Sequence, residues 1–153
     1  MEKNNLLVLV ENIGVGGQER VAVNTANILN EDYNIVLAIF YKEEYNYKFD
    51  GVLLNLEIPP VQGTVNKINT FINLYQRVCA VKKLKREYKI DVTISFGNVA
   101  NIVNVLTKTS DKVLVSIRGY NHFSRSIMGK IKGEVIYGIA DTVVTVAKNY
   151  RRI

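Results

Sequence analysis

The sequence is poor in the residues that build disulfides, metal clusters and disordered tracts. Among its 153 residues it has one cysteine, Cys79, one histidine, His122, and two prolines. A single cysteine excludes an intramolecular disulfide and favours a cytoplasmic protein, and one cysteine with one histidine argues against a metal site. No apolar run approaches the roughly 20 residues of a membrane span. The opening MEKNN lacks the pattern of a signal peptide.

The composition is that of a globular protein with an excess of positive charge. Apolar residues make up 48% and charged residues 22% of the chain, and the net charge is +6. This length predicts a single domain spanning 1–153 with a real core. The charge suits an anionic partner such as a phosphorylated substrate or a phospholipid surface, although solubility alone also explains it. A nucleic-acid partner is not expected, because no recognition helix or aromatic RNA-binding motif is present.

Apolar runs alternate with helical patterns along the chain, which predicts an α/β, Rossmann-like fold. We expect a mostly parallel sheet of about six strands with helices on both faces. The predicted strands are Leu6–Val10, Ile35–Tyr41, Val52–Ile58, Asp91–Phe96, Lys112–Arg118 and Thr142–Val146, and the predicted helices are Gln18–Leu29, Thr64–Lys89, Val99–Leu106 and Phe123–Ala140.

Three details of this prediction depend on local pattern. The polar connection 42–51 is short for a crossover, so the second and third strands are predicted to form an antiparallel hairpin. Thr64 is the expected N-cap of the long helix. Apolar stripes should face the core: Ile68, Phe71, Ile72, Tyr75, Val78, Cys79 and Leu84 on that helix, and Phe123, Ile127, Ile131, Val135 and Ile139 on the last one.

The strongest local signal is a glycine-rich turn between the first strand and the first helix. Gly14, Gly16 and Gly17 follow the apolar run Leu6–Val10. Glycines permit positive φ and close approach to the backbone, and the helix that follows points unpaired N–H groups at the turn, which favours an anion. The same glycines also suit a simple tight turn.

Two further loops should join this turn at the carboxyl ends of the strands, where ligands bind in such sheets. They are Phe96–Asn98 and Arg118–His122. The residues expected to bind substrate or phosphate are Gly16, Gly17, Gln18, Arg118 and His122, with weaker candidates Ser95, Gly97, Asn98 and Asn121. Arg118 suits an anion clamp or a surface ion pair. His122 suits a ligand contact or plain solvation, and Ser95, Gly97 and Asn98 also suit turn chemistry.

Other features exclude common chemistries. A dinucleotide fingerprint would need a third glycine where Glu19 stands, and no Gly-Lys-Ser/Thr ending or G-x-S-x-G nucleophile motif is present. His122 has no partners for a catalytic triad. Cys79 is expected in the core. The basic segment Lys82–Lys89 is expected to be either a solvated face or a contact for an anionic membrane.

Several segments resemble the GT4-type retaining glycosyltransferases of the GT-B fold. Gly16-Gly17-Gln18-Glu19-Arg20, followed by a Val- and Ala-rich helix, is similar to the GG-(A/Q/T)-E-(R/K) turn of that family. The run Ile90–Ser95 resembles its "pDvviS" strand, and Ile139–Val146 resembles its "aD.vvavS" segment. The chain departs from the pattern at Ala147, where many relatives carry serine, and at Arg118, where many carry histidine.

The resemblance implies the acceptor-binding, N-terminal half of a sugar-nucleotide-dependent enzyme, in cell-surface polysaccharide or glycolipid assembly. The donor would be a UDP- or GDP-sugar, the acceptor a glycan or a lipid-linked glycan, and no metal or other cofactor is implied. Catalytic residues are expected mainly in a C-terminal donor-binding domain that this chain lacks, so the isolated domain should be inactive. The resemblance also implies a cytoplasmic location, with peripheral contact at the inner face of the plasma membrane. The alternative is a stand-alone nucleotide-binding or regulatory α/β module.

Overall fold

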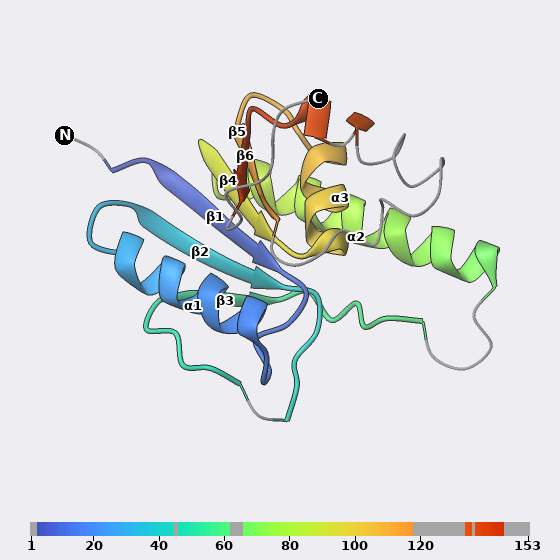
Figure 1. Cartoon of the computed structure of the whole chain (residues 1–153), viewed down its shortest axis with the longest axis horizontal. Helices are drawn as coiled ribbons and strands as arrows, with labels where there is room; N and C mark the ends of the chain where they lie inside the picture. The colour runs from blue at the N-terminus through green and yellow to red at the C-terminus, as the bar shows by residue number, and fades with distance from the viewer. Residues whose placement is uncertain (1–2, 45, 62–65, 118–133, 136, 146–153) are drawn as a thin grey trace.

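In the computed structural model, the residues described are 3–44, 46–61, 66–117, 134–135 and 137–145 (Figure 1). Six strands in this part of the chain form one parallel sheet in the order β3-β2-β1-β4-β5-β6. Their bounds are β1 Asn5–Val10, β2 Asn34–Ile39, β3 Val52–Asn55, β4 Val92–Phe96, β5 Lys112–Ile117 and β6 Thr142–Thr145. The predicted Rossmann-like α/β fold is therefore confirmed.

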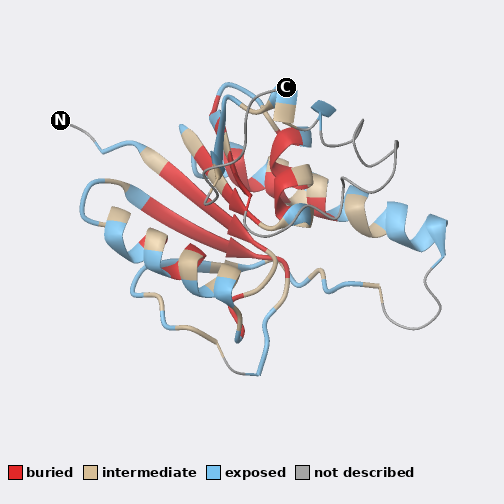
Figure 2. Ribbon diagram, in the orientation of Figure 1, coloured by how far each residue is buried: buried red, intermediate tan, exposed pale blue. Residues whose placement is uncertain are grey.

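Helices cover both faces of the sheet, as predicted. Alternate residues of β1 enter different cores: Val8 packs with Ala22 and Val23 of α1 (Gly17–Leu29), whereas Leu9 packs with Val81 of α2. This division follows from the two-residue period of a strand, which sends successive side chains to opposite faces. Helix α2 (Lys67–Glu87) and helix α3 (Asn98–Leu106) share the second face. Figure 2 shows the buried central strands between these layers.

The predicted hairpin between the second and third strands is wrong. β2 and β3 are parallel, with Val36 opposite Val52. The connection 40–51 has no helix among its described residues; instead Tyr47 and Phe49 pack against the core on the α1 face. The backbone N–H of Tyr47 donates to the carbonyl of Ile13 over 2.8 Å. An extended segment held in this way crosses the sheet with fewer residues than a helix would need.

The predicted core face of α2 is wrong along most of the helix. Ile68, Phe71, Ile72, Tyr75 and Cys79 are exposed. The buried side chains are instead Arg77, Val81, Leu84 and Lys85. The reason is length: a helix of 21 residues is about 31 Å long, while a six-residue strand such as β1 covers about 20 Å. The N-terminal part of α2 therefore extends beyond the sheet (Figure 1).

Two further details differ from the sequence prediction. The N-cap of α2 is Asn66, whose side-chain oxygen accepts from the backbone N–H of Asn69 over 2.7 Å. Thr64 lies outside the described residues. In the last predicted helix, Val135 and Ile139 are exposed, and it is Tyr137 and Ala140 that pack on the β5 side of the core.

Candidate functional site

The carboxyl edge of the central strands is where the predicted site should lie. β1 pairs with β4 and β4 with β5, so the three strands are neighbours as predicted. Val10 lies opposite Phe96 in the sheet register. The segments that leave β1 and β4 therefore start at the same level, and both lead at once into helices.

Two helices begin at this edge, each with a glycine as N-cap. Gly16 precedes α1 and Gly97 precedes α3, and neither helix has a side-chain cap. The first N–H groups of a helix have no partner within the helix, and the helix dipole adds partial positive charge there. The edge thus presents two neighbouring sets of backbone donors, which is a suitable setting for an anionic ligand.

The side chain of Gln18, from the start of α1, lies beside Gly97 at the start of α3. A Cβ built on Gly97 would lie 3.3 Å from the Oε1 atom of Gln18. Gly97 has φ of +98°, whereas no described glycine before α1 has a positive φ. The glycines of the Gly14–Gly17 turn therefore do not use the positive φ that they permit, and the left-handed conformation belongs to Gly97. Gly17 faces open space, because no heavy atom lies within 4 Å of a Cβ placed there.

Glu19 places a carboxylate at the start of α1. A Cβ built on Gly16 would meet its Oε2 atom at 2.0 Å. A carboxylate three residues after the N-cap compensates the positive end of the helix dipole. An anionic ligand that approached Gly16 would have to displace this side chain, while Gly17 and Gln18 remain accessible beside it.

A charged cluster that sequence analysis missed supports the segment after β1. Arg77 of α2 is buried; its Nη1 donates to Glu11 Oε1 over 3.1 Å and its Nη2 to the carbonyl of Ile58 over 3.0 Å. The guanidinium also lies over the Phe40 ring, 4.5 Å from its centre. Such contacts hold Glu11 at the carboxyl edge of the sheet. Arg77 has helical spacing with Val81 and Leu84, which is the signal that could have revealed it.

Asn12 and Tyr41 form a second polar pair at this edge. The Asn12 amide donates to the Tyr41 hydroxyl over 2.9 Å, and its oxygen accepts from the Gly14 N–H over 2.9 Å. Burial raises the pKa of Tyr41, and Glu11 and Glu43 act in the same direction, against the hydrogen bond from Asn12. Tyr41 is therefore a neutral hydroxyl at physiological pH, able to bind a hydroxyl or carbonyl group.

Ser95 is buried and directed into the interior of the domain. Its hydroxyl donates to Asn101 Oδ1 over 2.7 Å and accepts from the Asn104 amide over 3.1 Å. Gly97 and Asn98 lie at the start of α3, and Gly97 is next to the Gln18 side chain. Arg118, Asn121 and His122 lie outside the described residues, so their ligand contacts stay a prediction.

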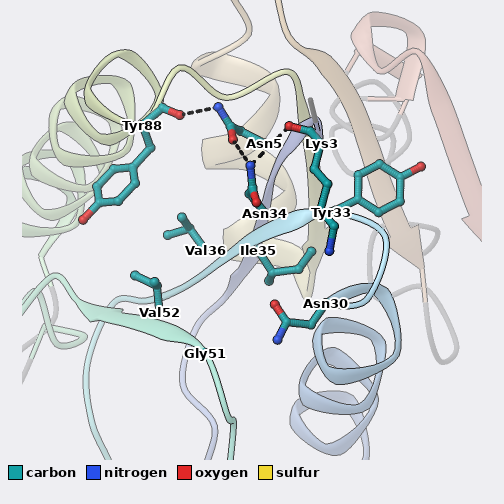
Figure 3. Close-up of a pocket in the computed structure, with 10 residues that line it drawn as sticks. All are labelled: Lys3, Asn5, Asn30, Tyr33, Asn34, Ile35, Val36, Gly51, Val52 and Tyr88. Carbon is teal, nitrogen blue, oxygen red and sulfur yellow. Dashed lines mark hydrogen bonds between the residues drawn. The ribbon is translucent and has the colours of Figure 1, made fainter. Parts of the chain in front are cut away.

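A shallow pocket of about 320 Å³ occupies the opposite, amino-terminal edge of the sheet (Figure 3). Asn5 and Asn34, which line it, hydrogen-bond to each other over 3.1 Å. The Asn5 amide also donates to the Tyr88 carbonyl over 3.1 Å. These polar groups hold the ends of β1, β2 and α2 together. The pocket therefore has a structural explanation and lies away from both helix starts.

The described part of the chain holds neither a metal-ligand cluster nor a membrane-spanning helix. No three His, Cys, Asp or Glu side chains come together there as a metal-ion site would require. Nor does a helix within those residues have the length and apolarity that crossing a bilayer needs.

No protein-family model and no curated protein sequence matches the chain, but solved structures share its fold. Sucrose-phosphate synthase of Thermosynechococcus elongatus superimposes with a TM-score of 0.67 at 12% identity over 92% of this chain. MurG of Acinetobacter baumannii gives 0.65 at 12% over 98%. UDP-N-acetylglucosamine 2-epimerase of Rickettsia bellii gives 0.69 at 12% over 96%.

The matches cover only 42%, 43% and 40% of those three chains, so this chain spans about two fifths of their length. The neighbours are glycosyltransferases and an epimerase with the GT-B fold. The chain has the fold of one Rossmann-like half of such proteins. At this identity the likeness establishes the fold and leaves the activity open.

Proposed function

We propose that the chain is the N-terminal, acceptor-binding half of a sugar-nucleotide-dependent glycosyltransferase of the GT4 type. The observation that carries the proposal is the meeting of two helix starts without side-chain caps, at Gly16–Gln18 and Gly97–Asn98, on the carboxyl edge of the sheet. The match to about two fifths of larger GT-B proteins supports it, as does the GG-Q-E-R sequence. In this proposal residues 1–153 are one domain, and a second domain supplies most donor contacts and the catalytic residues.

The proposed roles follow from the chemistry of each group. The backbone N–H groups of Gly17 and Gln18 would stabilise negative charge on the donor diphosphate. Arg118 would add a guanidinium to the same anion, and His122 and Asn121 would contact the sugar or acceptor. No metal would be needed, because these donors neutralise the phosphates. The enzyme would work in the cytoplasm, in polysaccharide or glycolipid assembly, with an acceptor carried on the inner face of the plasma membrane.

An NMR titration of the isotope-labelled chain with UDP and GDP tests this placement. We expect weak binding, on the order of 0.1 mM or weaker, because most of the donor contacts belong to the other half. The amide signals that shift should be those of residues 16–18 and 97–98. Absence of shifts at both helix starts, or shifts centred on Asn5 and Asn34, would contradict the proposal.

One observation favours a second candidate, a stand-alone nucleotide-binding module. The strand order β3-β2-β1-β4-β5-β6 is that of dinucleotide-binding domains. Against it, Glu19 stands where the third glycine of the fingerprint belongs, and its carboxylate lies over Gly16. Calorimetry with NAD distinguishes the two: submicromolar affinity would favour the module, and weak or no binding favours the half-enzyme.

A further inference from the structure

The segments that leave β1 and β2 bring a carboxylate, an amide and a phenol together at the carboxyl edge of the sheet. Val10 lies opposite Ile39 at the ends of these two strands, so the residues that follow emerge side by side (Figure 1). The carbonyl of Glu11 accepts from the backbone N–H of Tyr41 over 3.4 Å. Glu11, Asn12 and Tyr41 are all partly exposed. We call these three residues the β1–β2 cluster.

The carboxylate of Glu11 is held in place by a buried cation. Its Oε1 accepts from Arg77 Nη1 over 3.1 Å, and the side chains of Arg77 and Glu11 are 3% and 35% exposed. Arg77 is itself fixed, because its Nη2 donates to the Ile58 carbonyl and its guanidinium lies over the Phe40 ring. Its Nε is buried and has no partner within the described residues, so the guanidinium has a donor left for an additional oxygen. Glu11 therefore keeps one position and, being partly exposed, can accept a further hydrogen bond.

The phenol of Tyr41 has a proton to offer. Its oxygen accepts from the Asn12 amide over 2.9 Å, and no group among the described residues accepts its own proton. Burial raises the pKa of Tyr41, against the hydrogen bond from Asn12, and the nearby charges of Glu11 and Glu43 raise it further. Asn12 is fixed in turn, because its oxygen accepts from the Gly14 N–H over 2.9 Å. The cluster thus presents an acceptor, on Glu11, and a donor, on Tyr41.

This combination selects among ligand chemistries. An ammonium group could bind Glu11, but it has no lone pair to accept the Tyr41 proton. A phosphate or carboxylate could accept that proton, but it would be repelled by Glu11 and by Glu43, whose Cγ lies 2.9 Å from a Cβ built on Gly14. A hydroxyl group both donates and accepts. Neighbouring hydroxyls on one ring, as in a saccharide, therefore satisfy both side chains at once.

We propose that the β1–β2 cluster is a subsite for an uncharged saccharide ring, in which Glu11 accepts from one hydroxyl and Tyr41 donates to another. Arg77 and Asn12 hold these two groups in place. The carboxyl edge is then divided, with backbone donors for an anion at the starts of α1 and α3 and a neutral subsite after β1 and β2. That the ring belongs to an acceptor rests on the proposed function, whereas the subsite itself rests on the contacts of these side chains.

An NMR titration of the isotope-labelled 153-residue chain with the methyl glycosides of glucose, galactose and mannose, without nucleotide, tests the subsite. We expect at least one of them to shift the amide signals of residues 11, 12 and 41. The Kd should be on the order of 10 mM, since only a few hydrogen bonds hold the ring. The methyl uronide of the same sugar should bind at least about threefold more weakly at low salt, because its carboxylate meets those of the protein.

Variants of the two ligand-binding side chains sharpen the test. Tyr41→Phe removes the donor and keeps the ring, so binding should weaken about fivefold or more. Glu11→Gln should weaken it about threefold and narrow the difference between the sugar and its uronide. Tyr33→Phe and Glu31→Gln make the same changes toward the amino-terminal edge of the sheet and should bind within about twofold of the original chain. Circular dichroism and urea unfolding verify that every variant folds.

Three results would overturn the proposal. They are no shift of these amides by any of the three glycosides at about 100 mM, equal affinity for the sugar and its uronide, and binding by Tyr41→Phe within about twofold of the original chain. None of them touches the proposed function, which the UDP and GDP titration tests at residues 16–18 and 97–98. Saccharide binding without any nucleotide binding would support the subsite and contradict the half-enzyme.

Discussion

Lys85 and Asp111 form an ion pair inside the domain, where α2, α3 and β4 meet. Lys85 Nζ lies 2.7 Å from Asp111 Oδ2, and the two side chains are 2% and 0% exposed. Lys85 also donates to Asn104 Oδ1 over 3.1 Å, and Thr93 donates to the carboxylate over 2.8 Å. Burial of two charges is tolerated here because these hydrogen bonds replace those to water.

Removal of one partner should therefore be costly. We expect Lys85→Met to lower the free energy of unfolding by about 3 kcal/mol or more at neutral pH, because Asp111 would keep a buried charge without its cation. Urea unfolding followed by circular dichroism measures the change. Lys83→Met is the matched control: Lys83 is 76% exposed and pairs with Glu87, so its loss should change stability by about 0.5 kcal/mol or less.

The same pair should make the benefit of Lys85 depend on pH. Burial alone would raise the pKa of Asp111, but the hydrogen bonds from Lys85, Thr109 and Thr93 outweigh it and hold the pKa below its usual value. A depressed carboxyl pKa contributes stability above the unfolded value of about 3.9, and this contribution is lost as the pH falls through the folded value. The difference between the original chain and Lys85→Met should shrink from neutral pH to about pH 3. A constant difference in urea midpoints would contradict this.

The same substitution should destabilise the domain at Gly97 and leave its stability almost unchanged at Gly17. Gly97→Ala places a side chain at φ of +98° and 3.3 Å from the Gln18 oxygen, so we expect a loss of about 1–2 kcal/mol in unfolding free energy. Gly17→Ala meets no atom within 4 Å and should change stability by about 0.5 kcal/mol or less, since alanine favours helix. In the NMR titration, however, Gly17→Ala should weaken UDP binding. Equal stability of the two variants would show that Gly97 is not strained.

At the scale of elements, α2 has two halves held by different means. The C-terminal half is anchored by Arg77, Val81, Leu84 and Lys85, whereas residues 67–72 are exposed and their start depends on the Asn66 cap. A helix end without core contacts can open without unfolding of the domain. The cap should therefore control the exposed half alone.

We expect Asn66→Ala to speed amide hydrogen exchange at Asn69 and Thr70 by about fivefold, because an N-cap contributes about 1 kcal/mol. The urea midpoint of the whole chain should barely move. Asn69→Ala is the control, as it alters an exposed side chain of the same turn and keeps the Asn66 oxygen in place. A drop of about 1 kcal/mol in global stability for Asn66→Ala would show that the whole helix unfolds with the core.

The elements also show which parts of the fold the sequence could predict. β1 was predictable because five consecutive apolar residues, Leu6–Val10, are typical of a strand buried on both faces, and all five are buried. The core face of α2 was not predictable, because the more apolar row of the helix is the exposed one. That row holds Phe71 and Tyr75, whereas the buried row holds Arg77 and Lys85. Only the length of the sheet and partners distant in sequence, such as Glu11 and Asp111, decide which row is buried.

At the scale of the whole molecule, the adjacency of β1, β4 and β5 followed from the usual order of a doubly wound sheet, and so the helix starts could be expected to meet. The position of the Gln18 side chain beside Gly97 could not be expected, because it brings together residues far apart in the chain and depends on a rotamer choice. The parallel pairing of β2 and β3 could not be predicted from the sequence pattern either. The pattern gives the length of the connection but not the path that it takes.

The proposed sharing of the site between two lobes leads to the last prediction. The described carboxyl edge offers backbone donors and an Asn12–Tyr41 pair, and the fold spans about two fifths of its larger neighbours. A site between two lobes excludes water only when both are present. We therefore expect the 153-residue chain to release no UDP or GDP from sugar nucleotides, with or without acceptors, in a coupled nucleotide-release assay.

A donor-binding lobe added as a separate chain should restore turnover. The substitution Gly17→Ala in the 153-residue chain should reduce this restored turnover. Turnover by the isolated chain would show that one lobe suffices and would contradict the half-enzyme.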